Sequence, residues 1–218
     1  MTSAHPGFRW KLAAAIGCFL TIAGCVIWVD RPAELWAFEH VRQRGVFVAI
    51  NYLLYPIMAF VCLRLAGYGI GAIFFGRKSY RLDTAFGCCL AVAIALTLTE
   101  TLKVVTGRIG PESFQGSPSW IRDGIYGFFP FHLGPGYAYF PSGHTSITAA
   151  FAGVLWMRKP KLRVAWLALT VAMMVSLVAA GWHWISDTIA GLALGLFCAR
   201  STATLLRWDA PPVPHDPK

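Results

Sequence analysis

Charged residues are scarce in this sequence: they make up 13% of its 218 residues, whereas 56% are hydrophobic and the mean hydropathy is +0.56. Soluble domains carry about 25% charged residues, which keep their surfaces in water. The chain therefore has more apolar surface than one soluble core can hide, and an ordinary soluble domain is excluded. The composition predicts an all-α polytopic membrane protein, with residues 1–218 forming a single membrane-embedded domain.

The sequence also lacks the patterns of a disulfide framework, a zinc site or a nucleic-acid-binding surface. The formal net charge is +9, but no basic run is interleaved with aromatic residues, so nucleic acid is not an expected partner. No small-residue cleavage site ends the apolar run after Arg9 and Lys11, which we therefore interpret as an uncleaved first span. All six cysteines fall inside apolar stretches, where they act as small hydrophobic residues (Cys18, Cys25, Cys62, Cys88, Cys89 and Cys198).

Long apolar stretches take the place of the missing charge. A membrane-spanning helix needs roughly 20 mostly apolar residues. Six stretches come close to this length and predict a bundle of six transmembrane helices (Leu12–Val29, Val46–Leu65, Thr84–Leu102, Ser142–Met157, Val164–Gly181 and Ser186–Leu206). Apolar residues continue after the second stretch to Phe75, so we expect that helix either to bend at its glycines or to run on along the interface.

The segments between these stretches differ in character. Residues 31–45 open with Pro32 and mix apolar with charged residues, which predicts an amphipathic helix at the membrane interface. Residues 107–140 are rich in Gly, Pro and aromatic residues without a helical period, which predicts a long loop. Long loops in compact domains are often functional. Its rings either cover a site or act as ordinary anchors at headgroup level. The proline-rich tail after Trp208 is predicted to be disordered.

Lysine and arginine indicate the orientation, because cytoplasmic loops retain an excess of positive charge. An even number of spans puts all basic clusters on one side, together with both termini (Arg9, Lys11, Arg77, Lys78, Arg81, Arg158, Lys159, Lys161, Arg163, Arg200 and Arg207). We interpret this side as the cytoplasm of a bacterium and the membrane as its inner membrane. The long loop, the end of the third span and the starts of the fourth and sixth then face the periplasm.

Polar residues gather on that outer side, first at the end of the third span. Glu100 and Lys103 share a helix face, with Arg108 five residues further on. An ion pair between Glu100 and Lys103 is the structural explanation. Ionisable groups near a membrane interior also mark functional sites, so Lys103 and Arg108 are candidates for binding an anion.

Two further clusters open the fourth and sixth spans. Ser142 is a suitable N-cap, and Gly143 allows close approach to the first-turn amides, which form an anion site beside His144. His183 and Asp187 are four residues apart, so the carboxylate can orient the imidazole as in a nucleophile or base. A capped helix and a structural His–Asp hydrogen bond are the alternatives. Two histidines without a third nearby ligand are a poor metal site.

Together the clusters favour phosphate binding and transfer, and their order resembles the type 2 phosphatidic acid phosphatase superfamily. That pattern is Lys, six residues, Arg-Pro; then Pro-Ser-Gly-His; then Ser-Arg, five residues, His, three residues, Asp. The chain matches it at Lys103 and Pro111, at residues 141–144, and at Ser176, His183 and Asp187. Both motif arginines are replaced, by Gly110 and Leu177, so Arg108 is the expected substitute, with Arg122 a weaker one.

The resemblance implies a metal-independent phosphatase without a cofactor, acting on a lipid phosphate. His183 would attack phosphorus and become a phosphohistidine, with Asp187 on its other ring nitrogen, while His144 protonates the leaving oxygen. Lys103, Arg108 and the amides after Ser142 and Gly143 would hold the phosphate (substrate-binding residues Lys103, Arg108, Ser142 and Gly143).

Several questions stay open at this level. Undecaprenyl diphosphate, phosphatidylglycerol phosphate and lipid A are all suitable substrates, and the oligomeric state is unknown. A lipid phosphotransferase of the same family and a catalytically impaired accessory protein are the alternative functions. Restoring Gly110→Arg and Leu177→Arg is the test of the last alternative.

Overall fold

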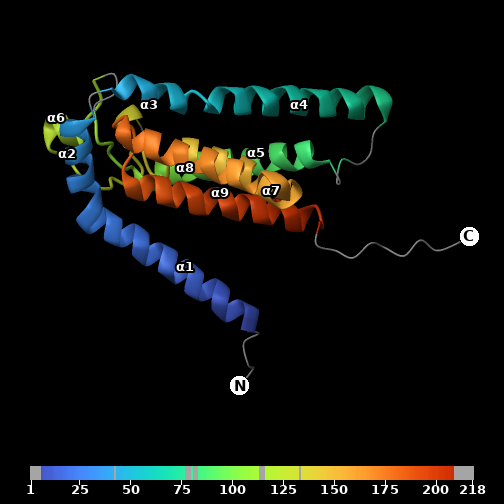
Figure 1. Cartoon of the computed structure of the whole chain (residues 1–218), viewed down its shortest axis with the longest axis horizontal. Helices are drawn as coiled ribbons and strands as arrows, with labels where there is room; N and C mark the ends of the chain where they lie inside the picture. The colour runs from blue at the N-terminus through green and yellow to red at the C-terminus, as the bar shows by residue number, and fades with distance from the viewer. Residues whose placement is uncertain are drawn as a thin grey trace, which may run out of the picture.

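The structure, a computed structural model, describes residues 6–41, 43–76, 80, 83–112, 116–132 and 134–208. These residues form helices joined by turns and one long loop (Figure 1). The predicted disorder of the tail after Trp208 concerns residues outside the described part of the chain. The helices are α1 (Pro6–Gly24), η1 (Cys25–Val29), α2 (Asp30–His40), α3 (Arg44–Asn51), α4 (Leu54–Phe75), α5 (Thr84–Thr106), α6 (Trp120–Asp123), η2 (Pro135–Tyr137), α7 (Gly143–Arg158), η3 (Pro160–Leu162), α8 (Arg163–Ala179) and α9 (Ile185–Leu205).

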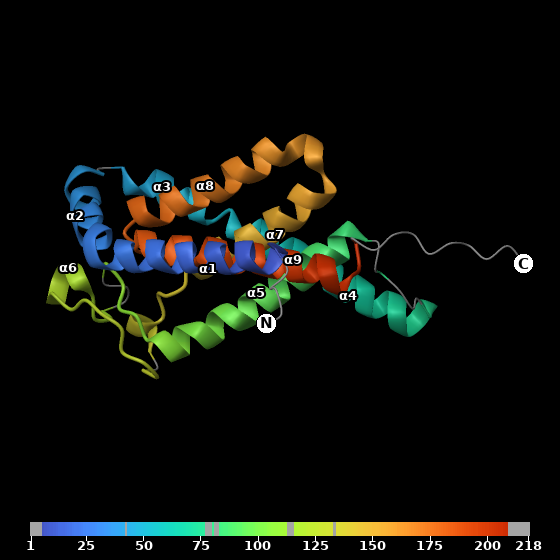
Figure 2. The same ribbon diagram turned by 90° about the horizontal axis from the view of Figure 1, so that it is seen from below.

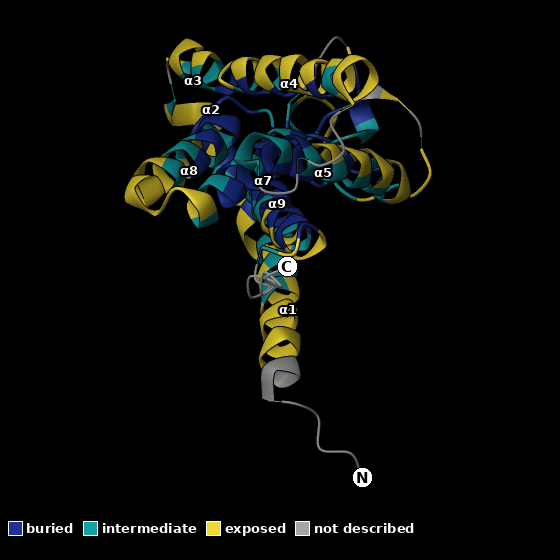
Figure 3. Cartoon of the chain, turned by 90° about the vertical axis from the view of Figure 1, so that its right-hand side faces the viewer, coloured by how far each residue is buried: buried dark blue, intermediate teal, exposed yellow. Residues whose placement is uncertain are grey.

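The predicted all-α membrane fold is confirmed. Within the described residues, five helical segments are long and apolar enough to cross a membrane (Trp10–His40, Arg44–Phe75, Thr84–Thr106, Pro160–Ala179 and Ile185–Leu205). The remaining predicted span, Ser142–Met157, corresponds to α7, which has 16 residues. Ten of these are buried, and α7 contacts α5, α8 and α9 (Figure 3). α7 is therefore a short central helix around which longer helices pack.

Small residues bring α7 and α9 close together. A Cβ atom added to Gly191 would lie 2.6 Å from the carbonyl oxygen of Ser142, and one added to Gly195 would lie 2.5 Å from that of Ser146. Such close backbone approach is how helices associate inside membranes, where apolar surface alone provides no driving force. The contact sets the first turns of α7 and α9 side by side.

The second predicted span is interrupted at a place that the sequence did not indicate. Turns at Tyr52 and Leu53 separate α3 from α4. Pro56 follows shortly after, and because proline has no N–H it cannot donate a helical hydrogen bond to the carbonyl of Tyr52. The helix then continues through Gly67, Gly69 and Gly71 to Phe75. α4 is therefore continuous past these glycines, so the apolar residues up to Phe75 belong to the same helix.

The first predicted span runs on into the amphipathic segment. α1, η1 and α2 follow one another without an intervening loop, so α2 begins at Asp30 rather than at Pro32. Asp30 and Glu34 are buried, each 1% exposed, whereas Leu35, Trp36 and Phe38 are exposed. The predicted helix is amphipathic, but two of its carboxylates face the protein and its large apolar side chains face outward, while Glu39 is exposed.

One end of the bundle gathers α2, α6, the long loop, the C-terminus of α5 and the N-termini of α7 and α9 (Figures 1 and 2). In the parts of the predicted loop that the structure describes, residues 107–112, 116–132 and 134–140, the helices are the short α6 and η2. α1 leaves the bundle at an angle (Figure 3), and its apolar side chains are exposed, as expected of a helix whose surroundings are lipid. All three polar clusters of the sequence therefore belong to the same end of the molecule.

Candidate active site

Lys103 lies in the last turn of α5. Its ammonium group donates to Oε1 of Glu100 at 2.7 Å, so the predicted ion pair exists. The same nitrogen is 3.3 Å from the position of a Cβ atom on Gly143, which places it over the first residue of α7. Gly107 ends α5 with φ +56°, and a side chain there would collide with the carbonyl oxygen of Phe129. This glycine turns the chain into the loop directly after Lys103.

Ser142 caps α7 as predicted. Its hydroxyl oxygen accepts from the amide of Thr145 at 3.4 Å, and its own amide donates to the carbonyl oxygen of Asp187 at 3.0 Å. The Ser142 side chain is fully buried, so its contribution is to the helix terminus rather than to a ligand. Within the described residues, the amides of Gly143 and His144 have no acceptor and belong to the positive end of the α7 dipole.

His183 and Asp187 meet at the start of α9. Nδ1 of His183 and Oδ2 of Asp187 are 3.3 Å apart, and the same oxygen accepts from the amide of Trp184 at 3.0 Å. Asp187 is fully buried and His183 is 8% exposed. A carboxylate bonded to Nδ1 leaves Nε2 as the ring nitrogen that can carry an unshared electron pair toward a ligand.

A cavity of about 400 Å³ opens beside both histidines. His144 lines it from the first turn of α7 and His183 from the connection between α8 and α9. The ring of Trp182 packs against His144 at a centroid distance of 5.8 Å. Glu112 also lines it and pairs with Arg44 of α3. The full lining is Glu112, Tyr139, His144, Ala180, Gly181, Trp182 and His183. His144 and His183 thus line one cavity, with Asp187 behind His183. Lys103 lies over Gly143, the residue before His144.

Arg108 does not lie where a substitute for the missing phosphate-binding arginines was expected. It is fully buried, and its guanidinium donates to Oδ1 of Asp187 and to Oδ2 of Asp30, both at 2.6 Å. Burial by itself lowers the pKa of Arg108, but the charges of Asp187 and Asp30 outweigh it and raise that pKa. Arg108 therefore supports Asp187 instead of lining the cavity. Arg122 is exposed and donates to Asp123, its neighbour in the loop.

Tyr139 occupies the space beside Gly110, one of the two replaced arginine positions. A Cβ atom on Gly110 would lie 2.2 Å from Cζ of Tyr139. The same ring packs against His183 with centroids 5.6 Å apart, and burial raises the pKa of its hydroxyl. At the other position, Leu177 is fully buried. The sequence reasoning did not single out Tyr139 for the site, because it is one of many aromatic residues in the loop.

Asp30 and the pair of Arg44 with Glu112 were also missed. The acidic residue that begins α2 and the basic residue that begins α3 lie far along the chain from the motifs. The local signal for Asp30 was a carboxylate directly after the apolar run that ends at Val29, with a second one four residues later at Glu34. Their position at the site depends on long-range folding.

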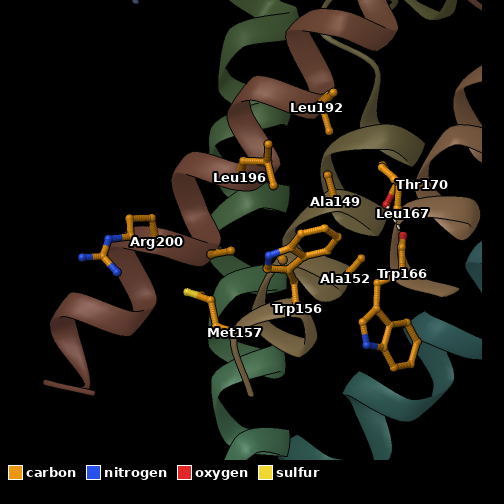
Figure 4. Close-up of a pocket in the computed structure, with 12 residues that line it drawn as sticks. Ala149, Ala152, Trp156, Met157, Trp166, Leu167, Thr170, Leu192, Leu196 and Arg200 are labelled. Atoms are coloured by element: carbon orange, nitrogen blue, oxygen red, sulfur yellow. Dashed lines mark hydrogen bonds between the residues drawn. The ribbon is translucent and has the colours of Figure 1, made fainter. Parts of the chain in front are cut away.

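A second cavity, of about 390 Å³, lies between α7, α8 and α9 (Figure 4). Trp156, Met157 and Leu196 surround it, and Arg200 is the one charged residue of its lining. It contains none of the predicted catalytic residues. The chemistry-bearing side chains are therefore concentrated in the cavity at the loop end.

Comparisons with known proteins point to one family. The family model of the PAP2 superfamily matches residues 84–210, more than half of the chain. Lipid A 1-phosphatases of Rhizobium johnstonii and Rhizobium etli are each 34% identical over 106 residues, 49% of this chain. The match spans only 41% and 43% of those relatives.

A solved structure supports the fold as a whole. The transmembrane PAP2-type phosphatidylglycerolphosphate phosphatase of Bacillus subtilis superimposes with a TM-score of 0.58 at 20% identity. The superposition covers 91% of this chain and 98% of that chain. At this identity the likeness concerns the fold.

Proposed function

The chain belongs to the PAP2 superfamily, and from this premise we propose that it is a lipid phosphate phosphatase that works through a phosphohistidine. One observation carries the proposal: His144 and His183 line the same cavity, with Asp187 behind His183. Lys103 and the free amides at the start of α7 lie beside them. This is a set of groups that binds a phosphoryl group and transfers it.

In the first step, Nε2 of His183 attacks phosphorus and a P–N bond forms. The P–O bond to the lipid breaks, and His144 gives a proton to the departing oxygen. Asp187 accepts from Nδ1, so it stabilises the positive charge that His183 gains. Lys103 and the amides of Gly143 and His144 balance the charge on the phosphoryl oxygens.

In the second step, water attacks the phosphorus of the phosphohistidine. His144 accepts a proton from this water, the P–N bond breaks, and inorganic phosphate leaves. His183 returns to its neutral form with Nδ1 still bonded to Asp187. Neither step needs an electron donor or acceptor.

We place the cavity at the periplasmic face of a bacterial inner membrane, with both termini in the cytoplasm. Support comes from the position of the loop end, opposite the basic residues that join α7 to α8. These residues, Arg158, Lys159, Lys161 and Arg163, are typical of a cytoplasmic connection.

For the substrate we propose a lipid A class phosphate, carried on a sugar. The two rhizobial relatives are named as phosphatases of the lipid A 1-phosphate, although the match covers less than half of each. Trp182 and Tyr139 line the cavity, and aromatic rings of this kind suit the apolar face of a sugar.

The test is phosphate release from purified lipid phosphates in detergent with a chelator present. The panel contains lipid A, undecaprenyl diphosphate, phosphatidylglycerol phosphate and phosphatidic acid. We expect release to be fastest with lipid A and to fall at least about 10³-fold in His183→Ala and about 10²-fold or more in His144→Ala. An acid-labile, base-stable phosphate label should appear on His183.

Arg163→Ala is the matched control, because it removes a cation from the opposite end of the bundle. Its rate should equal that of the wild type. Activity that survives in His183→Ala would overturn the nucleophile assignment. Transfer of the phosphate to an added acceptor lipid, with little release to water, would indicate the phosphotransferase instead.

A further inference from the structure

We propose that Asp30 is a positioning residue for the catalytic pair His183 and Asp187, acting through Arg108; the inference rests on the proposed function. Asp30 begins α2 and lies outside residues 84–210, the part that matches the family model. The N-terminal segment therefore completes the active site, in addition to anchoring the chain in the membrane.

Asp30 is held in one orientation by donors from the opposite end of the sequence. Its Oδ1 accepts from the amide of Ser186 at 3.0 Å, and its Oδ2 accepts from the Ser186 hydroxyl at 2.5 Å. Oδ2 also accepts from the guanidinium of Arg108 at 2.6 Å. The residue is 1% exposed, so water does not compete for these bonds.

Arg108 transmits this orientation to the nucleophile. One terminal nitrogen binds Asp30, and the other donates to Oδ1 of Asp187 at 2.6 Å. Oδ2 of Asp187 is then left for Nδ1 of His183 and the Trp184 amide. A planar guanidinium fixes both carboxylates at once, because its nitrogens have a rigid geometry. Rotation of the Asp187 carboxylate would break its hydrogen bond with Arg108. A continuous chain of contacts therefore leads from Asp30 through Arg108 and Asp187 to the imidazole of His183.

The charges explain why a second carboxylate is needed. Arg108 with Asp187 alone would be a neutral pair, in which the guanidinium weakens the attraction of Asp187 for a positive imidazole. Asp30 leaves the buried group with one net negative charge. When His183 forms its P–N bond and becomes positive, that negative charge stabilises it across a region of low dielectric constant.

The burial of two carboxylates in α2 agrees with this assignment. A helix at a membrane interface ordinarily turns its carboxylates to water. Here Asp30 and Glu34 are both buried, although burying a carboxylate is costly without a partner. Asp30 accepts from Arg108, from the amide and hydroxyl of Ser186 and from the Tyr126 hydroxyl, whereas within the described residues both oxygens of Glu34 are without a donor. Glu34 is thus a matched control one helical turn away.

The experiment compares Asp30→Asn with Glu34→Gln in the full chain in detergent. The substrate is the lipid phosphate that the wild type hydrolyses fastest. Asp30→Asn should lower kcat by about tenfold or more and leave KM within about twofold, because Asp30 does not touch the phosphate. Glu34→Gln should keep both constants within about twofold. The label on His183 should form more slowly in Asp30→Asn.

A second readout does not depend on turnover. Diethyl pyrocarbonate modifies a free imidazole nitrogen, and mass spectrometry follows its attachment to His183. We expect this rate to change several-fold in Asp30→Asn and not in Glu34→Gln. If the wild type releases phosphate from no lipid while the modification rates still separate in this way, the proposed function fails and the positioning role stands.

Ser186→Ala provides a milder variant if Asp30→Asn does not fold. The Ser186 hydroxyl bridges Asp30 and Arg108 at 2.5 and 2.6 Å, so its loss should lower kcat about threefold with KM unchanged. Equal effects of Asp30→Asn and Glu34→Gln on kcat and on modification would overturn the proposal. A change confined to KM would do so as well.

Discussion

At Gly110 the ring of Tyr139 fills the volume in which a side chain would begin. Restoring an arginine at this position is therefore different from restoring a phosphate ligand, since the Cβ atom would lie 2.2 Å from Cζ of Tyr139. Leu177 presents a related obstacle: it is fully buried, and an arginine there would bury a charge in the bundle. Gly110 and Leu177 therefore both fit the way in which the residues around this site pack.

Gly110→Arg alone is expected to lower phosphate release at least tenfold, because Tyr139 must move away from His183. Gly110→Arg combined with Tyr139→Gly removes the collision and should recover part of the lost activity. Initial rates of phosphate release from the preferred lipid measure both variants. Equal activity in the single variant and the wild type would show that the Tyr139 ring is free to move. Tyr139→Gly alone serves as the control for loss of the ring.

Among the helices, the contact between α7 and α9 decides whether the two histidines share a cavity. Gly191, Gly195 and Ala199 repeat every four residues along α9 and allow its backbone to approach α7. A Cβ atom on Gly195 would come within 2.6 Å of Cβ of Ala149 as well as 2.5 Å of the Ser146 carbonyl. His144 lies in the first turn of α7 and His183 lies two residues before α9, so this contact brings the two histidines near each other.

Gly195→Val should destabilise the protein by roughly 1–3 kcal/mol, the usual effect of overpacking. Its thermal unfolding midpoint in detergent should fall by about 5 °C, and phosphate release should fall with it. Gly67→Val in α4 is the control, because a Cβ atom there meets no atom within 4 Å. A midpoint for Gly195→Val as high as that of Gly67→Val would contradict the close α7–α9 contact.

For the whole molecule, orientation follows from charge. The loop end carries the cavity, and the connection between α7 and α8 carries Arg158, Lys159, Lys161 and Arg163. Because positively charged connections are typical of the cytoplasmic side, the orientation that we propose puts the cavity at the periplasmic face, where a lipid substrate would arrive from the outer leaflet.

Reporter fusions test this orientation. Alkaline phosphatase joined after Gly124 in the loop should be active, because its disulfides form only outside the cytoplasm. The same reporter joined after Lys161 should be inactive, while green fluorescent protein at these two points should give the opposite result. The reverse pattern would place the cavity in the cytoplasm.

Much of the fold was predictable from composition and local order. Apolar length predicted the helices because a membrane requires about 20 such residues, whatever they pack against. Lys103, the first turn of α7, and the pair of His183 with Asp187 were recognisable because each motif is local: a helix end, an N-cap, a four-residue spacing. These features depend on neighbours within a few residues, and residue order contains that information.

Tertiary contacts decided the rest. Asp30 and Ser186 are 156 residues apart in the sequence, and Arg108 and Asp187 are 79 residues apart. No local sequence pattern could therefore predict either contact. Arg108 was expected to bind the phosphate because the sequence gives its charge but does not show that its side chain is buried. The direction of α2's polar face, the ring beside Gly110 and the cavity itself arise only when helices distant in the chain close on one another.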